Sequence, residues 1–380
     1  MRSSVLTNLS LLSFKCFAKL ELELRPLTLL SGVNGGGKSS VIQALALLAQ
    51  TLVEREWGRT LLLEGPDLAL GSAADVLNQW SGRRQLAIGA STASEHVLWG
   101  FKVDDRRALS VELEAVIVNE QLLMLTEPIR WLLPAERANS SAVVAALRRL
   151  SWITAERMGP RELLPLRDLD GHAQVGARGE LAAGLLYWRE SDDVIPGICV
   201  SGSPPTLFHQ VRARMQEFFP GCDLRVSPVE GASAVSLRLR TDPRADFQRP
   251  QNVGFGLTQL FPILVAVLAA RPGDILLVEN PEVHLHPQAQ QRIGSLLASV
   301  AANGIQVVVE THSDHVLNGV RLAVKQRAIE ADRVAMHFFA PTLTGGEFVP
   351  LSPKIDVDGK LDAWPEGFFD QLDLALSQLL

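Results

Sequence analysis

The chain of 380 residues is 47% hydrophobic and 21% charged, so it can bury a sizeable core, and global disorder is excluded. Its 36 Lys and Arg stand against 42 Asp and Glu, a formal charge of −6, which argues against coating nucleic acid through bulk charge. Cys16, Cys199 and Cys222 are scattered without metal-ligand spacing, which favours a reducing compartment without disulfides or structural zinc.

The N-terminal region is predicted to form strands at 4–12 and 19–24 around a turn at 14–17, because apolar and polar residues alternate there. A short apolar strand follows from Pro26, and 39–52 has helical spacing and strong helix formers. The segment carries Lys15 within its apolar part and lacks a cleavage pattern, so we do not expect a signal peptide.

The middle of the chain, about 54–249, is mixed and punctuated by Gly and Pro. Patterning predicts strands at 85–90, 96–103, 109–118 and 233–240, and helices at 142–150 and 211–219. We find no sustained heptads, which excludes a coiled-coil arm.

After Pro250 the pattern changes to alternating helices and strands. Predicted helices at 257–270, 287–302 and 313–324 alternate with apolar strands at 274–278 and 306–309. Such strands are typical of a parallel sheet covered on both faces, and we expect the two ends of the chain to share one sheet. The longest apolar run, 260–270, contains Pro262 and is shorter than the ~18 residues of a membrane span, so we expect a cytoplasmic protein without membrane contact.

A glycine-rich segment between the first apolar strand and the first helix has the spacing of a phosphate-binding loop. Gly-Val-Asn-Gly-Gly-Gly-Lys-Ser, residues 32–39, matches G-x-x-x-x-G-K-[ST], in which backbone N–H groups and a helix N-terminus surround phosphate oxygens. Lys38 would bridge the β- and γ-phosphates, and the Ser39 hydroxyl would bind Mg²⁺, so ATP and Mg²⁺ are the expected cofactors. The predicted nucleotide-binding residues here are Gly32, Asn34, Gly35, Gly36, Gly37, Lys38, Ser39 and Ser40.

A second motif, Glu-Asn-Pro-Glu at 279–282, ends an apolar strand. Most of the chain separates this motif from Lys38. Such a separation is found in ATPases of the ABC and SMC type rather than in small G proteins or nucleoside kinases. Glu279 is the predicted metal-shell residue and can reach the Mg²⁺ waters. Asn280 cannot take a proton but could position water, as an amide does in some GTPases. Glu282 is therefore the candidate base.

Two further segments complete the predicted site. Gly254 and Gly256 open a helix before the acidic strand, and a glycine-rich helix start is an anion site. In ABC-type ATPases such a loop from the opposing subunit covers the γ-phosphate, so Gly254, Gly256 and Gln259 are predicted to contact nucleotide; an ordinary helix start is the alternative. His312 at the tip of the next strand is the candidate switch histidine. Its competitors are His284, His286 and His315.

Taken together, these motifs resemble the ABC/SMC-like ATPases of the OLD and AAA15 groups, in the branch with a C-terminal DUF3696 domain. The matching segments are GVNGGGKSS (32–40), NVGFGLTQLFPIL (252–264), ENPEVHLHP (279–287), ETHSDHVLNGVR (310–321) and DAWPEGFFDQ (362–371), and ITAERMGPR (153–161) is similar to the family's insert motif. The resemblance implies an α/β P-loop NTPase of ABC/SMC-head type. It would have a mostly parallel core sheet, an antiparallel β subdomain, an inserted α/β lobe and no coiled coil.

The resemblance also implies a head that forms a homodimer around ATP. Asn280 stands where most such heads carry the catalytic Glu, which predicts slow hydrolysis, although the branch that the chain resembles shares it. Since no Toprim nuclease domain follows, we expect a separate effector, a nuclease or toxin, in bacterial anti-phage defence. We divide the chain at motif boundaries: 1–60 (first part of the head), 61–249 (inserted lobe and antiparallel strands), 250–340 (second part of the head) and 341–380 (DUF3696-like tail).

Two alternative functions remain open at this point. A non-hydrolysing, ATP-gated scaffold would follow if Asn280 makes hydrolysis negligible. A RecF-like DNA-repair ATPase would use a local arginine patch, for which Arg238, Arg240, Arg244 and Arg249 are candidates; a solvated strand face explains them equally well. Arg157 and Arg161 are candidates for contacting nucleotide or the partner subunit. Gln79 and Gln85 are guesses for the glutamine of a Q-loop.

Overall fold

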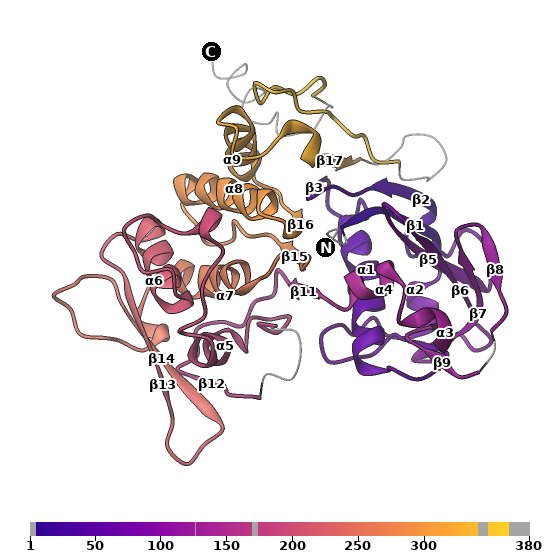
Figure 1. Ribbon diagram of the computed structural model, residues 1–380, viewed down its shortest axis with the longest axis horizontal. Helices are drawn as coiled ribbons and strands as arrows, with labels where there is room; N and C mark the ends of the chain where they lie inside the picture. The colour runs from indigo at the N-terminus through magenta and orange to yellow at the C-terminus, as the bar shows by residue number, and fades with distance from the viewer. Residues whose placement is uncertain (1–4, 126, 169–173, 341–348, 365–380) are drawn as a thin grey trace. The chain divides into compact units, whose positions relative to one another are not determined.

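A computed structural model describes residues 5–125, 127–168, 174–340 and 349–364. The chain forms two compact units (Figure 1). Unit 1 holds the chain up to Leu150 together with Asp332–Asp356, and unit 2 holds Ser151–Ala331. Our boundaries at 60, 249 and 340 divide the chain by motif rather than by contacts, and they stay a prediction.

Unit 1 is built around an antiparallel sheet in the order β2-β1-β5-β6-β7-β4, with β8 beside β7. In Figure 1 its central strands lie side by side, and α1 and α4 contact each other next to them. Trp99 and Phe101 on β6 are fully buried, because alternate side chains of each strand face the core. The strands are β1 Leu6–Phe14, β2 Phe17–Glu23, β4 Thr60–Leu62, β5 Gln85–Thr92, β6 His96–Lys102, β7 Ser110–Val118 and β8 Gln121–Leu123.

Strands from the two ends of the chain pair with each other in unit 1, as expected. β3 (Leu27–Gly32) and β17 (Val334–Phe339) pair in parallel, with Gly32 opposite Phe339. Both strands are almost wholly buried, which fits their continuous apolar sequences. The remaining elements of unit 1 are α1 Lys38–Glu54, α2 Ala73–Val76, β9 Ile129–Arg130, β10 Leu133–Pro134, α3 Ala135–Ala138 and α4 Ala142–Leu147.

Unit 2 contains the other parallel strands, β15 (Ile275–Glu279) and β16 (Gln306–Glu310). Their apolar residues are buried, and β11 (Leu150–Ile153), which begins at the boundary of the units, is hydrogen-bonded to β15. A smaller antiparallel sheet has the order β12-β14-β13. The other elements are β12 Leu163–Pro165, α5 Ala182–Trp188, α6 Leu207–Phe218, β13 Asp223–Pro228, β14 Ala234–Arg240, α7 Phe255–Ala269, α8 Pro287–Ala302 and α9 Asp314–Lys325.

The sequence-based elements are confirmed in type, with ends that move by a few residues. The predicted helix at 142–150 ends earlier, at Leu147, and its last position belongs to β11, a strand that patterning missed. β17 was missed as well. The longest helix of the described residues, α1, has 17 residues, so no coiled-coil arm is evident there. Among the described helices, none combines the length and apolar character that a membrane crossing requires.

Candidate functional site

The glycine-rich loop leads from β3 into α1 in unit 1. Gly37 caps α1 with its backbone at φ 104° and without a side-chain hydrogen bond, and Lys38 is the first helical residue. The Gly36 N–H donates to the Val33 carbonyl at 3.2 Å, which tightens the loop. This arrangement leaves the positive end of the α1 dipole beside the loop, where an anion is stabilised.

Two loop positions accept only glycine for geometric reasons. Gly32 has φ 130°, and a Cβ there would lie 2.1 Å from the Phe339 carbonyl oxygen on β17. At Gly37, a Cβ would lie 2.4 Å from the Phe17 ring. Gly32 and Gly37 are therefore fixed by the packing of unit 1 as well as by phosphate chemistry.

Lys38 lies under the loop. Its side chain is buried, and its ammonium donates to the Gly32 and Val33 carbonyls at 3.0 and 2.8 Å. Asn34, Gly35 and Ser39 are exposed. The ammonium thus lies within the turn that the motif is expected to fold around a phosphate.

A pocket of about 390 Å³ opens beside this loop, entirely within unit 1. A volume of this size is ordinary for a small-ligand site. The loop contributes Gly35, Gly37, Lys38, Ser39 and Ser40, and the facing residues are Lys15, Cys16, Asp75, Leu77, Gln79 and Trp80.

Of the two glutamines considered for a Q-loop, one lies at this pocket and the other does not. Gln79 lines it, whereas Gln85 starts β5 at an exposed position and donates to Glu114 at 2.6 Å. Trp80, which sequence reasoning did not single out, keeps 75% of its surface exposed at the pocket. An exposed aromatic face beside a phosphate loop offers a surface on which a base can stack.

The acidic motif forms a turn at the end of β15 in unit 2. Glu279 accepts hydrogen bonds from the Trp152 indole at 3.2 Å and from the Ala155 N–H at 3.1 Å. Burial raises the pKa of Glu279, against the opposing effect of these bonds. Asn280 adopts φ 43°, and its buried Oδ1 has no hydrogen-bond partner among the described residues. An orphaned buried oxygen at this turn is available to a water molecule or an ion.

Glu282 is held by the segment after β16. Its two carboxylate oxygens accept from the Thr311 hydroxyl at 2.9 Å and from the His312 N–H at 2.8 Å. Burial raises the pKa of Glu282, and the positive charge of Arg157 opposes this shift. A fixed carboxyl with a raised pKa is suited to accepting a proton.

The histidine and glycine predictions fall around the same turn. His312 is exposed, and its own N–H is one of the two donors to Glu282, whereas His286 caps α8 and His315 lies 3.8 Å from Asp314. His284 packs edge-on against Phe255. A Cβ on Gly256 would lie 2.7 Å from the His284 carbonyl oxygen, so the start of α7 packs against the loop that follows the acidic motif.

Gln259 and Arg157 are buried together. The Gln259 side-chain oxygen accepts from Arg157 Nε at 3.2 Å, and both residues are at most 5% exposed. In this structure Gln259 therefore contacts the insert motif, and Gly254 marks the start of α7. Arg161 is exposed.

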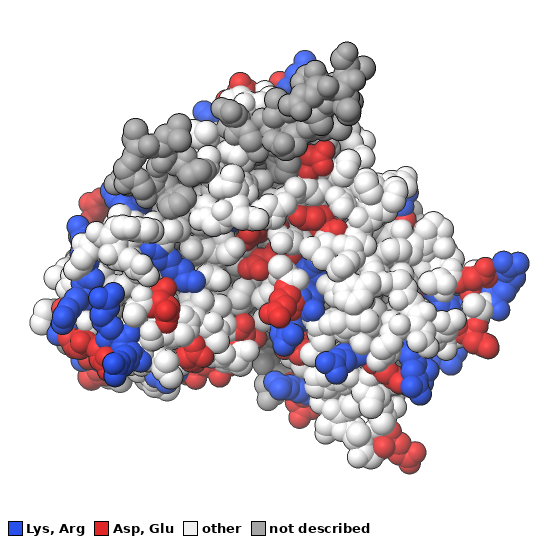
Figure 2. All heavy atoms as spheres, turned by 180° about the vertical axis from the view of Figure 1, so that it is seen from behind, with Lys and Arg blue, Asp and Glu red and all other residues white. Residues whose placement is uncertain are grey.

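The arginine cluster before α7 is paired with acids. Figure 2 shows Lys and Arg interspersed with Asp and Glu on the visible face. The pairs are Arg238 and Arg249 with Glu162, Arg240 with Asp223, and Arg244 with Asp242. Such pairing reduces the local positive potential that a DNA backbone would need.

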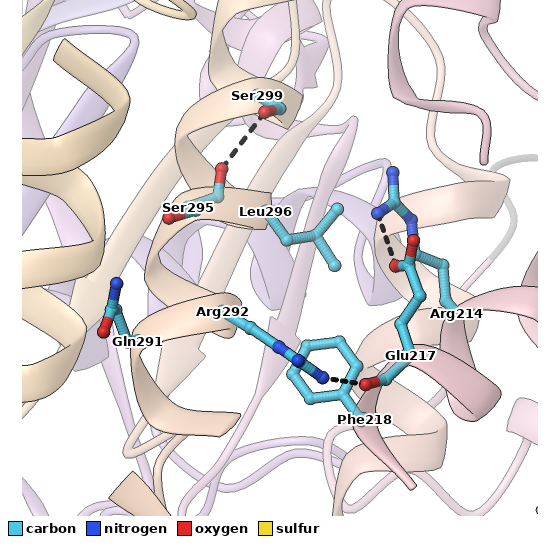
Figure 3. Close-up of a pocket in the computed structure, with 8 residues that line it drawn as sticks. All are labelled: Arg214, Glu217, Phe218, Gln291, Arg292, Ser295, Leu296 and Ser299. Carbon is cyan, nitrogen blue, oxygen red and sulfur yellow. Dashed lines mark hydrogen bonds and ion pairs between the residues drawn. The ribbon is translucent and has the colours of Figure 1, made fainter. Parts of the chain in front are cut away.

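A second pocket, about 430 Å³, lies between α6 and α8 (Figure 3). Arg214 pairs with Glu217 at 2.8 Å, and Arg292 donates to the Glu217 carbonyl. The pocket is lined by Arg214, Glu217, Phe218, Gln291, Arg292, Ser295, Leu296 and Ser299, none of which belongs to a predicted motif.

The described residues contain no group of three His, Cys, Asp or Glu that could hold a metal ion. The two predicted metal residues fall in different units, Ser39 after the glycine-rich loop of unit 1 and Glu279 at the end of β15 in unit 2.

Two family models match the chain. The family model described as "AAA domain, putative AbiEii toxin, Type IV TA system" matches residues 27–318, and the model of a protein of unknown function, DUF3696, matches 329–379. No protein of curated function matches the sequence significantly.

Solved structures show the fold. An SMC head bound to the C-winged helix domain of ScpA has a TM-score of 0.57 at 13% identity, covering 92% of this chain and 98% of that one. An SMC head domain with an extended coiled coil, bound to the C-terminal domain of ScpA derived from Pyrococcus furiosus, has a TM-score of 0.55 at 11% identity and covers 98% and 99%. The predicted SMC-head-like α/β fold is thereby confirmed.

Sequence reasoning missed the residues that hold the acidic turn. Trp152, Ala155 and Thr311 bind the two carboxylates, and Arg157 was noted only as a possible nucleotide or partner contact. Two signals were available, the insert motif at 153–161 and the matching segment at 310–321, which marked Ala155 and Thr311 without indicating their partners.

Proposed function

The chain belongs to the AAA-domain family of the AbiEii type and carries a DUF3696 segment, and from this membership we propose that it binds ATP, dimerises around it and hydrolyses it slowly to control a separate effector protein. Members of this P-loop family are ATPases. The observation that carries the proposal is the loop of unit 1, in which glycine geometry, a helix N-terminus and a buried Lys38 occur together.

In the proposed reaction the loop binds the phosphates and the pocket beside it takes the rest of the nucleotide. Lys38 would exchange its bonds to the Gly32 and Val33 carbonyls for bonds to the β- and γ-phosphates. Trp80 would stack on the base. Ser39 would hold Mg²⁺ directly and Glu279 through water; when bound, the ion neutralises charge that develops on the phosphates.

Glu282 is the residue that we assign as general base. Its position is fixed by two donors, and its raised pKa brings it closer to neutral pH. Asn280 would orient the water through its unpartnered Oδ1. Glu282 lies two residues after the usual position of the base, and Asn280 places an amide where an acid is common. Both features support slow turnover.

Support for an effector comes from the comparisons. The family description links its members to a toxin of a type IV toxin–antitoxin system, and the similar SMC heads were solved with a bound domain of ScpA. A head of this fold can therefore carry another protein. We propose that the partner here is a nuclease or toxin in anti-phage defence and that the protein acts in the cytoplasm.

The test is ATP binding and phosphate release by the wild type and by Lys38→Ala, with the oligomeric mass measured alongside. The proposal expects tight ATP binding, slow phosphate release and ATP-dependent dimerisation, all lost in Lys38→Ala. An oligomeric mass that is the same with and without nucleotide would refute the dimerisation.

One observation favours an alternative, the non-hydrolysing scaffold. Both carboxylate oxygens of Glu279 are already bonded, and Asn280 cannot accept a proton. Under this alternative the protein binds ATP tightly, and its phosphate release equals that of Lys38→Ala.

A further inference from the structure

Arg157 is a buried arginine that joins three segments of unit 2. It lies four residues after β11 and is 5% exposed. Its guanidinium donates to the Gln259 side chain on α7 at 3.2 Å, to the Glu279 and Asn280 carbonyls at 2.8 Å each, and to the Thr154 carbonyl at 3.2 Å. One side chain thus connects the insert motif, the start of α7 and the acidic turn.

Within the described part of the chain, the guanidinium makes these bonds without pairing directly with a carboxylate. Burial lowers the pKa of Arg157 to about 10, while the nearby charges of Glu282 and Glu279 act in the opposite direction. An arginine placed in this way is costly to bury, and its hydrogen bonds to neutral groups only partly offset the cost. A buried cation that is bonded to both the Glu279 and Asn280 carbonyls points to a role beyond packing.

The segment that carries Arg157 is itself fixed in unit 2. The Thr154 N–H donates to Ala177 at 2.8 Å, and the Met158 N–H donates to Arg178 at 2.7 Å, in both cases to the backbone carbonyl. Because the backbone around Arg157 is held and its guanidinium is planar and rigid, Arg157 sets the distance between Gln259 and the acidic turn. Displacement of the α7 start must break the bond to Gln259 or move the Glu279 and Asn280 carbonyls.

We propose that Arg157 is a positioning residue that couples the glycine-rich start of α7 to the acidic turn, so that whatever contacts Gly254 and Gly256 controls the alignment of Glu282 and Asn280. The inference rests on the proposed ATPase function and adds a mode of regulation to it. The effect of a contact at the start of α7 would be transmitted to Glu282 and Asn280 through the Arg157 side chain. The bond to Gln259 is the link that can open, because at 3.2 Å it is longer than the 2.8 Å bonds to the Glu279 and Asn280 carbonyls.

Arg157 also acts electrostatically on Glu282. Among the described residues, the charge of Arg157 acts on that carboxyl, and the His312 N–H donates to it. Loss of the Arg157 charge raises the pKa of Glu282, since the cation stabilises the ionised form. Because a base must be deprotonated to act, the acid limb of the rate profile then moves to higher pH.

The experiment compares the wild type, Arg157→Gln, Gln259→Leu and the double variant, with Arg189→Gln as a control outside the network. ATP affinity, kcat at saturating ATP and the pH profile of kcat are measured, and thermal melting checks folding. We expect kcat to fall at least about 10-fold in Arg157→Gln and about 3- to 10-fold in Gln259→Leu, with ATP affinity within about 3-fold of the wild type. The kcat of the double variant should fall no further than that of Arg157→Gln alone. The acid limb of the pH profile should move to higher pH only in the two variants that lack Arg157.

Additive losses in the double variant would overturn the coupling, and so would wild-type turnover in Gln259→Leu. If Arg157→Gln does not fold, Gln259→Leu decides through its kcat and its unchanged ATP affinity. Wild-type protein that releases no more phosphate than Lys38→Ala would refute the proposed hydrolysis, and the coupling with it. Wild-type hydrolysis that the Arg157 and Gln259 variants retain would refute the coupling alone.

Discussion

The glycine-rich loop of unit 1 and the acidic turn of unit 2 are built in opposite ways. Backbone makes the loop: glycines at positive φ, a helix N-terminus and carbonyls that hold Lys38. Side chains from separate segments hold the turn. Trp152 binds Glu279, and Thr311 binds Glu282. Arg157 donates to the Glu279 and Asn280 carbonyls. A loop of the first kind tolerates few residues but needs few neighbours, whereas a turn of the second kind depends on distant neighbours.

The largest expected effect lies in the loop. Lys38→Ala removes an ammonium that would make two charge-assisted bonds to phosphates, each worth about 1.5–3 kcal/mol. ATP affinity should therefore fall by about 10² to 10⁴-fold, and turnover should disappear with it. Titration calorimetry measures the affinity. Lys19→Ala, an exposed lysine on β2, is the matched control and should bind like the wild type.

The acidic turn should respond differently, with binding and turnover separated. Glu282→Gln keeps the size and an acceptor oxygen but cannot take a proton, so kcat should fall by about 10² to 10⁴-fold while ATP affinity is retained. Phosphate release at saturating ATP measures this, and Glu330→Gln on the surface is the control. Unchanged turnover would assign the base to another residue.

Backbone construction of the loop can be tested with two alanine substitutions. At Gly32 the new Cβ would meet the Phe339 carbonyl oxygen, so strain and overpacking together should cost about 2–5 kcal/mol of stability. At Gly35 the φ is also positive, 77°, but the space around it is open, so Gly35→Ala should cost only about 1 kcal/mol. Denaturant unfolding compares the two; equal losses would contradict the assigned role of β17.

The smallest effect is expected at the pocket wall. Trp80→Ala should weaken ATP binding by about 1–3 kcal/mol through lost stacking and leave the binding of inorganic tripolyphosphate unchanged. Trp80→Phe should keep most of the affinity, and Trp188→Ala, which changes a half-exposed tryptophan outside the pocket, should have no effect. If ATP and tripolyphosphate weaken equally in Trp80→Ala, the base does not stack there.

The same contrast explains what the sequence could predict. The loop is local: its glycines, Lys38 and the flanking strand and helix are consecutive, so one motif fixes their geometry. The apolar strands β15 and β16 were predicted for the same reason, since burial on both faces leaves a continuous apolar run.

The turn could be located but not assembled from the sequence. Glu282 was identified by its place after β15, yet its partner Thr311 lies after the next strand. Arg157 follows β11, a strand too short to show a pattern beside the predicted helix. Trp80 lacked any motif, and only the folded pocket connects it to Lys38. Of the DUF3696-like tail predicted at 341–380, positions 341–348 and 365–380 lie outside the described residues.

The most direct test of the account is the mass of the full-length protein in solution with ATP, with ADP and without nucleotide. Glu282→Gln, which should bind ATP without consuming it, is the form to measure beside the wild type and Lys38→Ala. We predict a dimer of Glu282→Gln with ATP, a monomer with ADP, and a monomer of Lys38→Ala under every condition. A mass that does not change with nucleotide in any of the three proteins would contradict the account.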